Sequence, residues 1–86
     1  MSPYEIFLRD EAVRALGGVR ARDRRLITAF IDSLAENPFA EGDYPMRDAT
    51  QREIQIKIIG AFAVTFWSDH AVREVRIIDI RKTVGA

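Results

Sequence analysis

The sequence contains no cysteine and a single histidine, His70. Without cysteine there is neither a disulfide framework nor a thiolate metal site, and one histidine cannot form a histidine cluster. We therefore expect no metal and no cofactor. The chain also lacks an excess of either charge, because thirteen basic residues balance thirteen acidic ones. Any binding of nucleic acid must then depend on a local patch rather than on the field of the whole molecule.

Long apolar runs are missing as well. No run approaches the roughly 18 residues needed to cross a bilayer, and the opening MSPYEIFLRD already carries charges. We expect no membrane contact and a cytoplasmic location. The chain does contain 48% hydrophobic and 30% charged residues, which is typical of one small folded domain over residues 1–86. Such a domain buries only about 60 to 65% of its unfolded surface, so a partner chain would help to stabilise it.

The first half of the chain predicts a strand followed by two helices. Tyr4, Ile6 and Leu8 recur at every second position, as in a strand, with Phe7 as the exception to the alternation. Asp10 can cap a short helix that stops at Gly17-Gly18. From Val19 a second helix of about 17 residues carries a single apolar stripe and ends near Asn37-Pro38.

The second half predicts a meander of three strands over residues 52–82. Apolar residues recur at every second position in the first two strands, at Ile54, Ile56, Ile58, Phe62, Val64 and Phe66. Residues 39–50 predict a connection with a short extended piece at 44–47. The fold class expected from these elements is α+β, with a helix hairpin packed on one face of a small, mainly antiparallel four-stranded sheet.

The predicted register follows from placing all the alternating apolar residues under the helices. It requires a three-residue connection at 59–61, with Gly60 at positive φ, and a two-residue turn at Asp69-His70. The opposite face, left open by the helices, then carries Glu53, Gln55, Lys57, Ala63, Thr65, Trp67, Glu74 and Arg76.

Two cations converge on this open face in the predicted register. Lys57 and Arg76 flank Ala63, with Cα atoms roughly 10 Å apart, so they could hold one phosphate-sized anion. Arg81 and Lys82 follow the last strand at the same end of the sheet.

The order of strand, helix hairpin and meander resembles the RelE/ParE superfamily of small toxins from bacterial toxin–antitoxin pairs. The resemblance covers nearly the whole chain and depends on four segments, YEIFLRDEAVRAL, LAENPF, IKIIGAFAVTF and VRIIDIRK. These are patterns of apolar spacing, which indicate a fold more specifically than an activity.

The resemblance also implies where a catalytic site would lie. Ribonuclease members of the family cut messenger RNA on the ribosome with basic residues on the open sheet face. The arginine that they carry on the middle strand is matched by Ala63, an arginine near the last strand by Arg81, and a tyrosine beyond it by Gly85. One of the three positions keeps the family residue.

Cleavage through a ribose 2′-hydroxyl needs a proton acceptor and cations around the phosphate. Lys57, Arg76 and Arg81 could supply the cations, and Glu74 or Glu53 the base. The alternative is an ordinary solvated sheet face with cross-strand ion pairs, each contributing under about 1 kcal/mol.

Four further residues are candidates for contact with a partner or RNA. Trp67 on the open face could anchor a partner chain or stack on a base. Lys82, Arg22 and Arg25 could contact a nucleic-acid backbone, or they could be solvated cations. His70 fits a surface turn better than a catalytic site, because about ten residues of strand separate it from Arg81.

Three hypotheses about function remain open. The first is a messenger-RNA endonuclease that acts with the ribosome, and the second is a gyrase inhibitor of the same fold, which needs no catalytic residues. The third is a binding module without toxicity. The first two imply a cognate antitoxin protein as partner.

Overall fold

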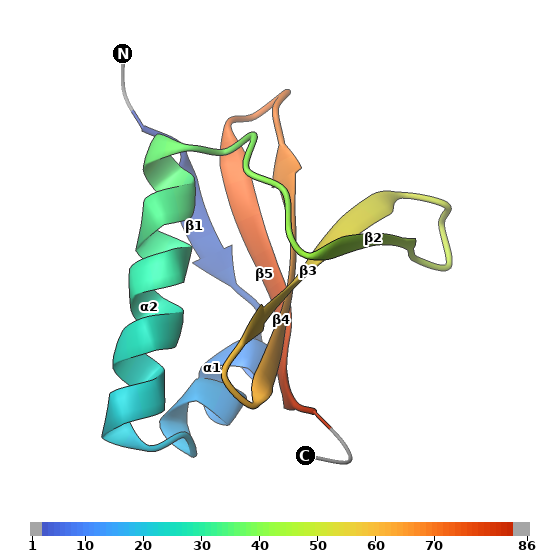
Figure 1. Ribbon diagram of the computed structural model, residues 1–86. Helices are drawn as coiled ribbons and strands as arrows, with labels where there is room; N and C mark the ends of the chain where they lie inside the picture. Colours follow the sequence, from blue (N-terminus) through green and yellow to red (C-terminus); the bar gives the residue numbers. More distant parts are fainter. Residues whose placement is uncertain (1–2, 84–86) are drawn as a thin grey trace.

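Two helices cover one face of a five-stranded mixed sheet in the computed structural model, which describes residues 3–83 (Figure 1). The elements in chain order are β1 Glu5–Leu8, α1 Asp10–Gly17, α2 Ala21–Glu36, β2 Tyr44–Arg47, β3 Glu53–Ile59, β4 Phe62–Asp69 and β5 Glu74–Lys82. The strand order across the sheet is β1-β5-β4-β3-β2. β1 runs parallel to β5, and every other neighbouring pair is antiparallel.

The α+β class, the helix hairpin on one face and the three-stranded meander are confirmed. The predicted number of strands is wrong, because the short extended piece Tyr44–Arg47 pairs with β3 as a fifth strand. All four of its residues are exposed. Its sequence therefore does not need the alternation of apolar and polar residues by which a strand is predicted. Among the described residues, no helix is long and apolar enough to cross a membrane.

The helices end close to where the sequence predicts. α1 stops at Gly17, and α2 stops at Glu36, directly before Asn37-Pro38. Asp10 does not cap α1, however. It is the first helical residue, where its negative charge lies at the positive end of the helix dipole, and Arg9 occupies the cap position.

The hydrophobic core lies between the helices and the face of β4 and β5 that they cover. Its buried members are Ala12, Val19, Ile27, Ile31, Leu34, Val64, Phe66, Val75, Ile77 and Ile80. The ring of Phe30 in α2 meets that of Phe66 in β4 edge to face, with centroids 5.5 Å apart. The apolar stripe of α2 thus covers the sheet face that carries Val64 and Phe66, as predicted.

The predicted register between β3 and β4 is wrong by one residue. Ile59 pairs with Phe62, so the connection is a two-residue turn, Gly60-Ala61, with Gly60 at a φ of +60°. Because this connection is one residue shorter than predicted, each side chain of β3 lies on the opposite face from the one predicted. Lys57, for example, pairs with Val64. The even-numbered isoleucines of β3 therefore lie on the open face.

The predicted register between β4 and β5 is wrong as well. Strand pairing continues to Asp69 opposite Glu74, so the turn spans residues 70–73 and is longer than the two residues predicted. A bulge between Thr65 and Phe66 then shifts the pairing by one residue. As a result Ile77 pairs with Phe66 and Ile80 with Val64, and all four side chains join the core.

The β2–β3 hairpin forms an arm that projects away from the helices (Figure 1). Gly42 precedes the arm and passes so close to β3 that an added Cβ would lie 2.4 Å from the carbonyl oxygen of Ile56. At the tip of the arm, Asp48 Oδ1 accepts hydrogen bonds from the backbone N–H groups of Thr50 and Arg52 and from the Thr50 hydroxyl. These contacts fix the loop that places Arg52.

Candidate functional site on the open sheet face

The open face is the side of the sheet that the helices leave uncovered. Residues that pair directly across neighbouring strands share a face, so the observed register assigns its members. They include Phe7, Ile54, Ile56, Ile58, Ala63, Thr65, Trp67, Glu74, Arg76, Asp79 and Arg81. The expectation is confirmed for Ala63, Thr65, Trp67, Glu74 and Arg76. It is wrong for Glu53, Gln55 and Lys57, which lie on the other side of β3.

Ala63 has different neighbours from those predicted. Ile58 lies on one side of it and Arg81 on the other. Lys57 and Arg76 therefore do not flank Ala63, because Lys57 lies opposite Val64 and Arg76 lies opposite Trp67. In the row formed across three strands by Ile58, Ala63 and Arg81, the cation is Arg81.

Each proposed catalytic cation already has a carboxylate partner. Arg76 donates to Glu74 on the same strand, and Arg81 Nε lies 2.8 Å from Asp79 Oδ2. Lys57 Nζ is 3.6 Å from Asp43, which also accepts a hydrogen bond from the Ile58 backbone N–H. Glu74 and Arg76 form a pair on the strand surface, and such a pair does not leave the carboxylate as an unpartnered base.

A groove of about 680 Å³ crosses the open face at the end away from Ala63. It lies between the tip of the arm and the strands β4, β5 and β1, and its lining residues are Phe7, Leu8, Arg9, Asp48, Arg52, Ile54, Trp67, Asp69, Arg76 and Ile78. The candidates Trp67 and Arg76 both belong to it. The arrangement brings an aromatic floor and several arginines into one concave surface.

Two arginines stack on aromatic rings in this groove. The guanidinium carbon of Arg52 is 4.2 Å from the centroid of the Trp67 ring, and that of Arg76 is 5.6 Å from the centroid of Phe7. Such cation–π contacts hold the guanidinium in place. Sequence reasoning missed Arg52 and Phe7 because both contacts depend on the register of neighbouring strands.

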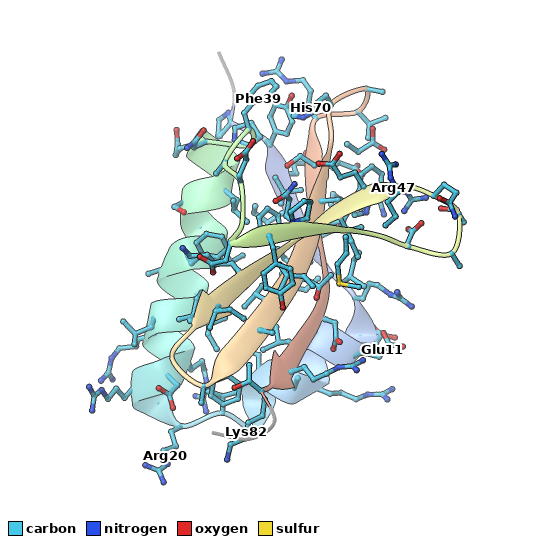
Figure 2. All side chains as sticks on the ribbon, turned by 45° about the vertical axis from the view of Figure 1, so that its right-hand side comes forward. Glu11, Arg20, Phe39, Arg47, His70 and Lys82 are labelled. Carbon is cyan, nitrogen blue, oxygen red and sulfur yellow. The ribbon has the colours of Figure 1, made fainter. Side chains whose placement is uncertain are left out.

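His70 lies in the turn between β4 and β5, as predicted, and it is exposed. Its ring stacks on Phe39 with centroids 4.3 Å apart, and its Nδ1 is 2.9 Å from the hydroxyl of Tyr4 in a hydrogen bond. Figure 2 shows Phe39 and His70 together at one end of the molecule, with Lys82 at the other. The turn that carries His70 joins the ends of β4 and β5 farthest from the Ala63–Arg81 pair.

The basic candidates at the other end form no ion pair within residues 3–83. Arg22 and Arg25 are exposed on α2, and Lys82 is exposed at the end of β5, opposite Phe62. Figure 2 places Arg20 and Lys82 at the same end of the molecule. Arg24 differs from these cations, because its guanidinium donates to the carbonyl oxygens of Leu16 and Val19 and closes the connection between the helices.

Asp48 is the carboxyl group of the groove whose pKa is shifted from its ordinary value. The hydrogen bond from the Thr50 side chain, helped by the backbone N–H groups of Arg52 and Thr50 and by the charge of Arg52, lowers the pKa of Asp48 below its ordinary value. In the part of the chain that the structure describes, no three His, Asp or Glu side chains gather closely enough to hold a metal ion. The position of Gly85 lies outside the described residues.

The architecture defines a class of small α+β domains in which a helix hairpin covers one face of a mixed sheet. No protein-family model matches the sequence, and no curated protein matches it. Solved structures do match the fold. A chain of the archaeal RelE-RelB complex from Pyrococcus horikoshii aligns with a TM-score of 0.81 at 15% identity, over 98% of this chain and 99% of that one.

Two further structures show the same likeness. A chain of a RelBE toxin–antitoxin complex from Mycobacterium tuberculosis aligns with a TM-score of 0.76 at 20% identity, over 93% of this chain and 98% of that one. The isolated RelE toxin of E. coli aligns with a TM-score of 0.70 at 10% identity, over 96% of this chain and 87% of that one. The chain therefore has the fold of the RelE toxins.

Proposed function

We propose that this chain is the toxin component of a type II toxin–antitoxin pair and that it acts in the cytoplasm. The observation that carries the proposal is the match of almost the whole fold to chains from RelE–RelB complexes, which extends over 98% of the chain in one case. The corresponding partner is a cognate antitoxin protein. The small core and the half-buried Trp67 on an open sheet face support a partner of this kind.

Binding to a target, rather than RNA cleavage, is the mode of action that the geometry supports best. Stabilising the transition state of phosphoryl transfer requires several donors around one phosphate. The open face offers Arg76 and Arg81, which are five residues apart on β5 and thus separated by about 16 Å. Each is paired with a carboxylate, and Lys57 lies on the other face.

A ribosome-dependent messenger-RNA endonuclease is the second candidate. The observation that favours it is the position of Arg81 on the open face, since Arg81 keeps a cation that the family resemblance implies. In that case Arg81 would contact the scissile phosphate, and Lys82, Arg22 and Arg25 would contact RNA or the ribosome.

Induced expression of the chain with and without the product of the neighbouring gene tests the proposal. We expect growth arrest when the chain is expressed alone, rescue by the neighbouring product, and co-purification of the two proteins. A chain that causes no arrest and binds no neighbouring product would be a toxin-fold binding module instead.

Primer extension on messenger RNA during arrest distinguishes the two modes of action. We expect no new message ends, and an assay of DNA supercoiling by gyrase would then test the inhibitor hypothesis. New ends that disappear in an Arg81→Ala variant would favour the endonuclease.

A further inference from the structure

We propose that the groove on the open face is the docking site for a short segment of the partner protein, one that carries an apolar or aromatic side chain flanked by carboxylates. The inference rests on the proposed function, which supplies the partner. It adds the surface that this partner uses and the chemistry that the surface selects.

The floor of the groove is apolar. Trp67 and Ile54 lie beside Phe7 and Ile78, and 43% of the surface of Phe7 remains exposed. A volume of about 680 Å³ falls in the range of pockets that hold a ligand of several side chains. Tryptophan is among the residues that contribute most to binding when a partner covers them. The floor therefore fits one bulky apolar side chain of the partner.

The rim of the groove carries two arginines, Arg9 and Arg52, that form only long ion pairs with carboxylates of the same chain. Arg52 is 3.8 Å from Asp48, and Arg9 is 3.6 Å from Glu11. Both separations exceed hydrogen-bond length, and neither guanidinium donates a hydrogen bond to any residue within 3–83. A guanidinium can donate five N–H groups in its own plane, and stacking on Trp67 holds that of Arg52 in one orientation. Carboxylates of a partner would satisfy these donors.

The two acidic residues of the lining favour a peptide over nucleic acid. Asp48 and Asp69 lie among the arginines, so a continuous row of phosphates would meet two negative charges in the groove. The whole chain has no net positive charge to compensate for this repulsion. A peptide can place single carboxylates against Arg9 and Arg52 and an apolar side chain between them.

The β2–β3 arm gives the groove one of its walls. Asp48 and Arg52 come from the loop at its tip, which Asp48 orders through hydrogen bonds from Thr50 and the Arg52 backbone. The wall is thus already formed in the free protein, which reduces the entropy lost when a partner segment binds.

The test is the affinity of the full chain for the purified product of the neighbouring gene, measured by calorimetry for the wild type and four variants. We expect Trp67→Ala to weaken binding by about 30-fold or more, as loss of a central aromatic anchor does. Arg52→Gln should weaken binding by about 5-fold to 50-fold and should reduce its dependence on salt.

Two variants outside the groove serve as matched controls. Phe39→Ala removes an aromatic side chain that is 73% exposed, and Arg14→Gln removes an exposed arginine of α1. Both should bind within about 2-fold of the wild type. If Trp67→Ala fails to fold, a charge-reversed Arg52→Glu variant carries the test, with an expected loss larger than that of Arg52→Gln.

The possible outcomes separate the inference from the proposed function. A wild type that does not bind the neighbouring product overturns both. A wild type that binds, together with Arg52 and Trp67 variants that bind equally well, overturns the groove and leaves the proposed function standing. Tight binding of a poly-uridine oligonucleotide that the same variants lose would replace the peptide by RNA.

Discussion

Arg81 lies directly opposite Ala63 in the antiparallel pair of β4 and β5, and its Nε donates to Asp79 at 2.8 Å. The methyl group of Ala63 thus lies beside Arg81, at the position where an arginine would place a second cation next to it. Arg81 is the one cation in the row of Ile58, Ala63 and Arg81.

A second arginine at this position should destabilise the fold slightly. We expect Ala63→Arg to reduce the free energy of unfolding by about 0.2 to 1 kcal/mol at low salt, because like charges directly opposite each other repel. The effect should shrink when salt shortens the screening length. Urea unfolding at low and high salt measures it, with Ala63→Gln as an uncharged control of comparable length. Equal stability of the two variants at low salt would contradict the observed pairing.

Substitution of Gly42 tests the close approach of the arm to β3. A Cβ at this position would lie 2.4 Å from the Ile56 carbonyl oxygen, and the nearby atoms are backbone, so we expect Gly42→Ala to cost about 1 to 3 kcal/mol. The matched control is Gly17→Ala at the end of α1, where an added Cβ meets nothing within 4 Å. That variant should be neutral or stabilising by up to about 1 kcal/mol. Thermal unfolding of both proteins checks the contrast.

Arg24 should differ sharply from its neighbours in α2. Its guanidinium donates to two backbone carbonyl oxygens in the connection between the helices, at Leu16 and Val19. Arg24→Ala should therefore cost about 1 to 3 kcal/mol, since it leaves both acceptors without this donor. Arg25→Ala removes an exposed cation without an ion pair within residues 3–83 and should change stability by less than about 0.5 kcal/mol. Urea unfolding that gives equal losses for the two would contradict this role for Arg24.

Acid should weaken the tip of the arm through Asp48. Because the pKa of Asp48 is lower in the folded protein, the carboxylate contributes stability above its unfolded value near 3.8. That contribution is lost as the pH falls through the lower folded pKa. The stability difference between the wild type and Asp48→Asn should therefore be largest near neutral pH and should fall away below about pH 4. Unfolding curves from pH 7 to pH 2.5 test the trend, and a constant difference would contradict it.

The alternation in β4 was sufficient to predict its two faces. Phe62, Val64 and Phe66 do face the helices, and Trp67 does lie on the open face. Here large apolar residues alternate with Ala63 and Thr65, so only one orientation buries the larger set.

The alternation in β3 was ambiguous for a physical reason. Ile58 and Ile59 are adjacent, so the end of the strand offers an isoleucine to either face. The open face is itself apolar around Ile54 and Ile56, each 8% exposed, so burial there did not require the helices. The same ambiguity affects Ile77 and Ile78 in β5, where the bulge shifts the pairing.

The sequence alone determined the order of strand, helix hairpin and meander, because helical and strand periodicities are local properties of the chain. It also determined where α2 ends, since Asn37-Pro38 acts on the neighbouring backbone. Only the tertiary structure decided which cations share a face. The Gly60-Ala61 turn is one residue shorter than predicted, and β5 contains one bulge, and each of these changes reverses the face on which the following residues lie. The groove around Trp67 likewise exists only once the arm, β1 and β5 are brought together from distant parts of the chain.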